Sequence, residues 1–183
     1  MLANKLIQAI TYATKKHEGQ IRKVDGVPYI VHPYRVAMLL KDEGYDDDIV
    51  IAGLLHDVVE DTDGTIREIS NLFGDQVAQL VSVATEPDKM KSWKERKKHT
   101  IQQLKEAPLE ARLVVCADKI DNLRSILENE QALGNDIWKH FNSSKEAQQW
   151  YYQEIYKSLQ TNLPTTSTPA LFKQLKQLID QFK

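Results

Sequence analysis

The sequence predicts an all-α fold, and three observations lead to that class. Seven glycines and six prolines in 183 residues leave few places where a helix must break. Apolar residues recur mostly at spacings of three and four, which is the period of amphipathic helices. With 42% hydrophobic and 27% charged residues, the chain has the composition of one compact domain that is large enough to bury a core.

The first helices follow from apolar stripes and from the positions of proline and glycine. An apolar stripe predicts a helix over residues 2–13, and residues 17–31 predict a loop because they hold two glycines and a proline. Pro33 is typical of a helix's first turn, so His32 is expected at a helix boundary. Gly44 is expected to end that helix.

The next helix is expected at the centre of the molecule, since Ile49–Leu55 is apolar on every side and the aspartates at 46–48 offer N-caps. Two capping boxes, Thr65 with Glu68 and Ser92 with Glu95, predict two further helix starts. Gly74 is expected to end the first of these helices, Asp75 to cap the next one and Pro108 to begin a long one. Apolar periodicity then predicts helices over 108–127, 151–159 and 171–182. Residues 1–160 are expected to form one domain, and 161–183 a linker and helix packed on it.

The charge and the apolar runs exclude several classes of protein. The formal net charge is −2, so the chain lacks the positive field that direct nucleic-acid binding requires. No apolar run reaches the roughly 18 residues of a membrane span, and the single Cys116 allows no internal disulfide. We expect a cytoplasmic protein that contacts no membrane. The aromatic residues at 150–152 and 156 indicate core packing or a subunit contact, which leaves a homo-oligomer open.

Charged residues at the end of the central apolar run are the first sign of chemistry. His56 and Asp57 follow that run directly, and Glu60 and Asp61 come one helical turn later. Three carboxylates this close repel one another unless a proton or a cation lies among them, and imidazole with carboxylate suits a first-row divalent ion. The sequence therefore predicts a metal site.

Two further residues complete a plausible ligand set. His32 precedes an apolar helix, and Asp118 interrupts another, with Asn122 one turn further on the same face. His32, His56, Asp57 and Asp118 would supply two nitrogen and two oxygen ligands, which favours manganese or a similar ion and leaves positions for water and a substrate oxygen. Such an ion promotes attack of water on phosphorus, and Glu60 with Asp61 would handle the protons.

Four segments carry a resemblance to a known family: Gly19–Lys23 (GQIRK), Pro28–Pro33 (PYIVHP), His56–Thr62 (HDVVEDT) and Ala117–Arg124 (ADKIDNLR). From residue 13 to about 127 the chain resembles the hydrolase domain of the RelA/SpoT-type alarmone enzymes, within the HD phosphohydrolases. Because a synthetase domain has no room here, it is similar to the stand-alone small alarmone hydrolases.

The resemblance implies an HD-domain helical bundle with a buried metal site and removal of the 3′-pyrophosphate from guanosine tetra- and pentaphosphate with Mn²⁺. Carried over by position, it implies that the metal ligands are His32, His56, Asp57 and Asp118, that Glu60 and Asp61 position or deprotonate the attacking water, and that Arg22, Lys23, Tyr29 and Asn122 contact the nucleotide. Physically, arginine stacks on a purine or forks onto phosphate, and lysine offers a compact cation.

Two departures from the family pattern keep other functions open. Asp121 stands where many members have His or Tyr, and residues 84–89 differ from the usual Val-Thr-based segment. The alternatives are an HD phosphohydrolase for another nucleotide and a nucleotide sensor without turnover. Both departures lie near where a nucleotide would sit, although nothing in the sequence distinguishes Asp121 from a solvent-facing helix residue. The basic residues at 89–98 could attract polyphosphate or an acidic partner, and we favour a solvated helix face over Trp93.

Overall fold

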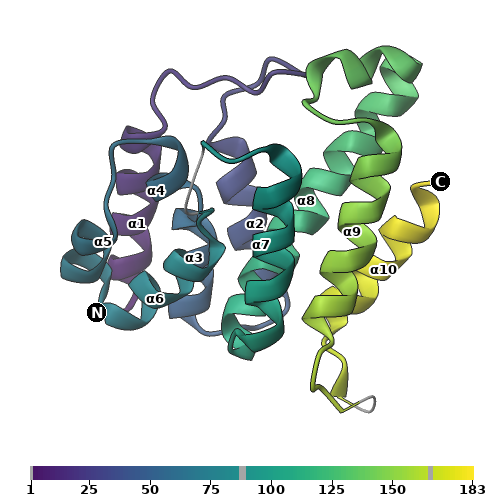
Figure 1. The fold of residues 1–183 in the computed structure, drawn as a ribbon. Coiled ribbons are helices and arrows are strands. Elements are labelled where there is room, and N and C mark those ends of the chain that lie inside the picture. The colour runs from purple at the N-terminus through teal and green to yellow at the C-terminus, as the bar shows by residue number, and fades with distance from the viewer. Residues whose placement is uncertain (1, 87–89, 165–166) are drawn as a thin grey trace.

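The structure is a computed structural model that describes residues 2–86, 90–164 and 167–183, and helices dominate it (Figure 1). The elements are α1 (Leu2–Lys16), α2 (Val31–Asp42), α3 (Asp47–Leu55), α4 (Val58–Asp61), α5 (Ile66–Phe73), α6 (Asp75–Ala84), α7 (Trp93–Glu106), α8 (Leu109–Leu133), the 3₁₀ helix η1 (Gly134–His140), α9 (Lys145–Leu159) and α10 (Ala170–Gln181). Within the described ranges there is no strand, and one isolated bridge joins Ile21 to Pro28 in the loop after α1. The predicted all-α class is confirmed.

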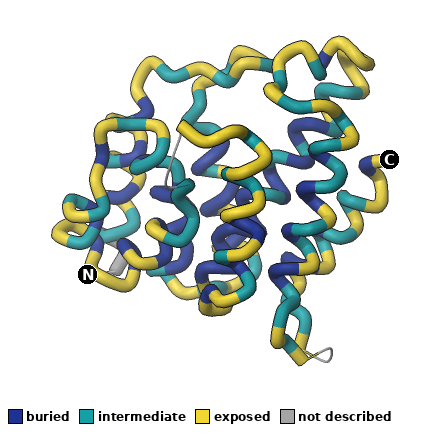
Figure 2. The backbone as a smooth tube through the Cα atoms, viewed as in Figure 1, coloured by how far each residue is buried: buried dark blue, intermediate teal, exposed yellow. Residues whose placement is uncertain are grey.

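Helix α3 lies at the centre of the core. Every residue from Ile49 to Leu55 is buried, as the apolar run predicts, and α3 packs against α1, α2, α6 and α8. Most buried residues in the middle of the molecule lie in α2, α3 and α8 (Figure 2). Gly53 allows α2 to approach closely, since a Cβ there would lie 2.4 Å from Leu40 Cδ1. This close approach sets the distance between the two elements that carry His32 and His56.

The outer helices form two flanks around this core. Helices α1, α5 and α6 lie on the side of the N-terminus, whereas α9 and α10 lie on the side of the C-terminus, against α8 (Figure 1). Helix α7 packs against α9. The division of the chain at residue 160 stays a prediction. Within the described ranges, no helix combines the length and the apolar character needed to cross a membrane.

Several helix ends differ from the sequence prediction, although both capping boxes are formed, at Thr65 and at Ser92. Helix α2 begins at Val31, which puts His32 inside its first turn rather than at its boundary. Helix α8 continues to Leu133, beyond the predicted end. At α6 the N-cap is Gly74, so the expectation that Asp75 caps this helix is wrong.

The regular helical spacing that the sequence analysis assumes from His56 to Asp61 is interrupted, because the chain leaves the helical pattern between α3 and α4. His56 Nδ1 donates to the carbonyl of Gly53 at 2.7 Å, and in an uninterrupted helix that carbonyl would accept from the N–H of Asp57. Asp57 then adopts φ −94° and ψ −6°, and its own carbonyl still accepts from the N–H of Asp61 at 2.9 Å. The break turns the Asp57 side chain toward His56 while Asp61 stays one turn away.

Candidate active site

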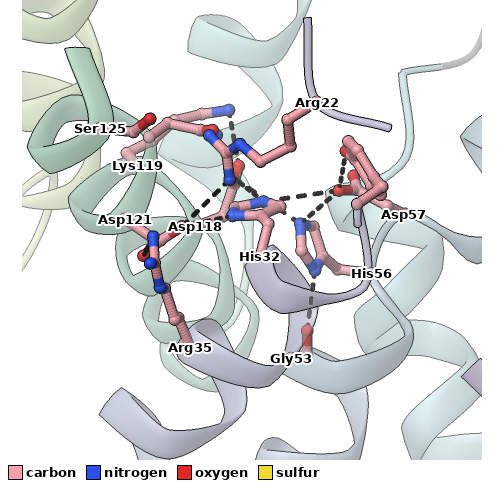
Figure 3. A network of polar contacts seen from close by, with 12 residues as sticks. Arg22, His32, Arg35, Gly53, His56, Asp57, Asp118, Lys119, Asp121 and Ser125 are labelled. Carbon is pink, nitrogen blue, oxygen red and sulfur yellow. Dashed lines mark hydrogen bonds and ion pairs between the residues drawn. The ribbon is translucent and has the colours of Figure 1, made fainter. Parts of the chain in front are cut away.

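Four side chains from three parts of the chain converge between α2, α3 and α8 (Figure 3). His32 comes from the first turn of α2, His56 and Asp57 follow α3, and Asp118 lies in the middle of α8. His32 Nε2 lies 3.2 Å from Asp118 Oδ1 and 3.5 Å from Asp57 Oδ2. His56 Nε2 lies 3.0 Å from Asp57 Oδ2 and 3.7 Å from Asp118 Oδ1. The structure thus brings together the predicted ligand set.

Both imidazoles are oriented by bonds on the side away from this cluster. His56 Nδ1 donates to the carbonyl of Gly53, and His32 Nδ1 donates to Asp121 Oδ2 at 2.7 Å. Each Nε2 therefore directs a lone pair at the cluster whenever its ring is neutral. His56 Nε2 is buried and forms no hydrogen bond of good geometry with the described residues, although Asp57 Oδ2 lies 3.0 Å from it. A buried nitrogen without a partner is costly, and a metal ion would supply one.

The donor set fits a divalent metal ion. Donor atoms of His32, His56 and Asp118 all lie within 4.8 Å of one another. An ion about 2.1 Å from each donor would hold neighbouring donors roughly 3.0–3.4 Å apart, close to the spacings between these imidazoles and carboxylates. Two nitrogens and two carboxylate oxygens suit first-row divalent ions.

The directions in which the pKa values of the four clustered side chains shift agree with a cation-binding site. Burial opposes charge on every member, but the adjacent aspartates outweigh burial and raise the pKa of His32 and His56. Despite burial, attraction to His56 lowers the pKa of Asp57, and the charge of Lys119 together with hydrogen bonds from the two histidines lowers the pKa of Asp118. The raised pKa favours protonated imidazoles beside the carboxylates, and a metal ion would compete with these protons for the same nitrogens.

Tyr29, Glu60 and Asp61 line a cavity of about 160 Å³ next to the cluster. The hydroxyl of Tyr29 donates to Asp57 Oδ2 at 2.6 Å and to Asp61 Oδ2 at 3.3 Å, and burial raises the pKa of Tyr29, which keeps it a donor. Glu60 Oε2 accepts from the backbone N–H of Glu86 at 3.1 Å. Burial raises the pKa of Glu60, which increases its strength as a base.

A larger cavity of about 360 Å³ adjoins the first and shares Tyr29, Lys97, Lys119 and Asn122 with it. Cationic side chains line this cavity: Arg22, Lys23, Arg96, Lys97 and Lys119. Aromatic and amide side chains also line it, including Phe141, Tyr151, Tyr152, Asn129 and Gln148. The predicted substrate contacts Arg22, Lys23, Tyr29 and Asn122 therefore all lie around one cavity beside the cluster. A ligand with both an anionic group and a flat polar ring matches this lining.

Comparison with known proteins identifies the family. A family model described as an HD domain matches residues 9–147. This chain belongs to the HD domain family. Human guanosine-3′,5′-bis(diphosphate) 3′-pyrophosphohydrolase MESH1 is 44% identical to the HD domain described here over 127 residues, which are 68% of this chain and 70% of that protein.

Two solved structures resemble this HD domain along most of its length. The crystal structure of lmo0812 from Listeria monocytogenes EGD-e gives a TM-score of 0.76 at 39% identity and covers 86% of this chain and 98% of that chain. A metazoan ortholog of SpoT that hydrolyses ppGpp and plays a role in starvation responses gives a TM-score of 0.78 at 32% identity, covering 97% of this chain and 94% of that chain.

Several residues at this HD site escape prediction from the sequence. The expectation of a solvated basic face is wrong for Arg96 and Lys97, because both line the larger cavity and pair with Glu86 at 2.9 and 2.5 Å. Residues 87–89 of the atypical segment lie outside the described residues. Lys119 lies 2.7 Å from Asp118 Oδ2, and a lysine inside the apolar run of α8 is the sequence signal that could have revealed it.

The position of Asp121, which the sequence leaves open, is decided by the structure. It is buried, 4% exposed, and accepts from His32, so it does not face the solvent. Its spacing of three residues from Asp118 puts both carboxylates on one face of α8. That spacing is the signal that could have linked Asp121 to the metal cluster rather than to the solvent.

Proposed function

We propose that this HD domain is a metal-dependent phosphohydrolase that removes the 3′-pyrophosphate from guanosine 3′,5′-bis(diphosphate) and pentaphosphate, with Mn²⁺ as the ion. The observation that carries the proposal is the cluster of four donors from His32, His56, Asp57 and Asp118, directly beside a cavity lined by cations. The human relative is named as a guanosine-3′,5′-bis(diphosphate) 3′-pyrophosphohydrolase, and the metazoan structural neighbour hydrolyses ppGpp, which supports this substrate.

His32, His56, Asp57 and Asp118 would hold the ion. The ion would polarise a phosphoryl oxygen and make a water molecule more acidic. Two contacts keep the carboxylates in place for this task, since Tyr29 donates to Asp57 and Lys119 pairs with the Asp118 oxygen that faces away from the histidines. These contacts would fix the orientation of the oxygens that face the ion.

Glu60 and Asp61 would manage the water that attacks phosphorus. The raised pKa of Glu60 suits a base that takes a proton from water near neutral pH, and Asp61 would orient that water. The water oxygen forms a bond to the phosphorus next to the ribose 3′ oxygen, and the bond from that phosphorus to the 3′ oxygen breaks. The 3′ oxygen keeps the electron pair and receives a proton, and pyrophosphate leaves.

The larger cavity would bind the rest of the nucleotide. Arg22 and Lys23 carry charges suited to the phosphates, and Asn122, which lines the cavity and donates to Asp118, would meet the sugar. The hydroxyl of Tyr151 is buried and lacks a hydrogen-bond partner among the described residues, although Tyr151 lines this cavity. A polar ring in the cavity would give this hydroxyl a partner.

Turnover with Mn²⁺ tests the proposal, using guanosine tetraphosphate, guanosine diphosphate, guanosine triphosphate and a reduced phosphorylated nicotinamide dinucleotide, each with a chelator control. We expect pyrophosphate from the tetraphosphate alone, and none with chelator. Phosphate release from another nucleotide would retain the metal chemistry and replace the substrate. Tight binding of metal and nucleotide without turnover would instead identify a sensor.

Two substitutions separate metal binding from proton transfer. Asp57→Ala should abolish both Mn²⁺ binding and turnover, because it removes a carboxylate that contacts both histidines. Glu60→Gln should keep Mn²⁺ binding and lower kcat by about 10²–10⁴-fold, the usual contribution of a general base. Full activity of Asp57→Ala would show that the site assignment is wrong.

A further inference from the structure

Asp121 is the residue that joins the predicted metal cluster to the larger cavity. Its Oδ2 accepts from His32 Nδ1 at 2.7 Å and lies 3.5 Å from Arg22 Nη1 (Figure 3). Its Oδ1 lies 3.9 Å from Arg35 Nη1. The Asp121 side chain is 5% exposed, whereas that of Arg35 is 48% exposed. The buried Asp121 Oδ2 therefore contacts both His32, a predicted metal ligand, and Arg22, which is predicted to bind the substrate.

The hydrogen bond to Asp121 determines what His32 offers to the cluster. A carboxylate that accepts from Nδ1–H holds the ring in the tautomer whose Nε2 lone pair is available, and it makes that nitrogen a stronger donor to a cation. His56 has only the neutral carbonyl of Gly53 in the corresponding place. The two histidines thus differ, and His32 has the charged acceptor.

The contact with Arg22 gives Asp121 a second role. Arg22 is 13% exposed, lines the larger cavity and lies 3.9 Å from Asp25 through Nε. Asp121 approaches Nη1 of the same guanidinium, so two carboxylates meet different edges of it. A guanidinium held on two edges has less freedom to leave the orientation in which it meets an anion.

We propose that Asp121 is a positioning residue that orients His32 for the divalent ion and Arg22 for the anionic group of the substrate. The inference rests on the proposed function for the identity of the ion and the substrate. It concerns a position at which this chain departs from the usual His or Tyr, neither of which supplies a carboxylate. Asp121 contacts neither the ion nor the reacting atoms, and it acts through the two side chains that it fixes.

The test compares Asp121→Ala and Asp121→Asn with Asp25→Asn in the full chain. Asp25 is the matched control, because its carboxylate meets Arg22 but is not in contact with His32. Mn²⁺ affinity is measured on metal-free protein without substrate, by titration followed by electron paramagnetic resonance. Urea unfolding of the metal-free variants shows whether each one folds, and Asp121→Asn serves if Asp121→Ala does not.

We expect Asp121→Ala to weaken Mn²⁺ binding by about 10–100-fold, the usual effect of losing such a partner of a ligating histidine. Asp121→Asn should lie between this variant and wild type, since an amide oxygen still accepts but carries no charge. Asp25→Asn should stay within about twofold of wild type, because it leaves His32 untouched. Affinities of both Asp121 variants equal to that of wild type would overturn the role toward His32.

The role toward Arg22 is read from kinetics at saturating Mn²⁺. Restored occupancy should bring kcat of Asp121→Asn back toward wild type, while KM for guanosine tetraphosphate stays raised by about three- to tenfold because Arg22 is less ordered. An unchanged KM would overturn this part. Wild type that fails to bind Mn²⁺ would overturn the proposed function and this inference together, whereas a fully active wild type with unaffected variants would overturn the inference alone.

Discussion

Replacing Arg112 by methionine tests how the helices around the larger cavity are held together. The buried guanidinium donates to main-chain carbonyls at two helix ends: those of Lys105 and Ala107 at the end of α7, and those of Leu159 and Thr161 at the end of α9. Carbonyls in the last turn of a helix have no helical N–H to accept from, and the helix dipole favours a cation there. One side chain thus fastens the helix that carries Arg96 and Lys97 to the helix that carries the cavity tyrosines.

Methionine retains much of the apolar volume of Arg112 but donates no hydrogen bond. The residues Ala107 and Leu159 are buried, so their carbonyls lose a partner that water does not replace, at about 1–3 kcal/mol each. The carbonyls of Lys105 and Thr161 lie in half-buried residues, where water reaches more readily. We therefore expect the free energy of unfolding to fall by about 2–6 kcal/mol, and Tm to fall by about 4–24 °C.

Urea unfolding of metal-free protein, followed by circular dichroism, measures this loss. Arg124→Met is the matched control on α8, since among the described residues the Arg124 guanidinium is seen to donate only to the side chain of Gln174, at 3.4 Å. This control should change the free energy of unfolding by less than about 1 kcal/mol. An Arg112→Met variant as stable as the control would refute the reasoning, because it would mean that the helix-end carbonyls are satisfied without the guanidinium.

Two further predictions concern the ionic groups of the site. Glu86→Gln should lower KM for guanosine tetraphosphate by about three- to fivefold, because the Glu86 carboxylate competes with the substrate phosphates for Arg96 and Lys97. One such charge is worth about 0.7–1 kcal/mol at 4–6 Å in a water-like medium. An unchanged KM at low ionic strength would count against this prediction. Mn²⁺ affinity should fall as pH is lowered from about 8 to about 6, because the aspartates raise the pKa of His32 and His56, the two histidines proposed as ligands. The ion must then displace protons, at up to about tenfold in affinity per pH unit for each proton. Calorimetry in buffers of different ionisation enthalpy measures the proton release, and affinity independent of pH would contradict the prediction.

The fold was predictable because its elements depend on local signals. The capping boxes at Thr65 and Ser92 mark helix starts as expected, and the run Ile49–Leu55 is buried on all sides because no face of it carries a polar residue. The break at His56 escaped prediction because it depends on a side-chain bond to the Gly53 carbonyl. Periodicity does not reveal whether an imidazole replaces a backbone donor.

The site was predictable only in part, for a different reason. The four predicted ligands stood out because each is a polar residue beside an apolar segment, and the structure does bring them together. The neighbours that orient them did not stand out. The bond between His32 and Asp121 spans 89 residues of sequence, and the pairing of Glu86 with Lys97 depends on how α7 packs. Such contacts follow from tertiary packing and leave no periodic signal.

The spacing of three polar residues on α8 explains why Asp118 and the two residues that contact its cluster, Asp121 and Asn122, lie together. Asp118, Asp121 and Asn122 are spaced by three and four residues and lie on one face of the helix, which packs against α2 and α3. Asp118 reaches both histidines, Asp121 reaches the far side of His32, and Asn122 donates to Asp118. Because α2 is held close to α3 at Gly53, the same helical face meets both imidazoles. A single turn of α8 therefore positions the proposed ligand Asp118, the acceptor Asp121 behind His32, and Asn122, which lines the cavity. A shift of α8 along its axis would disturb all three at once.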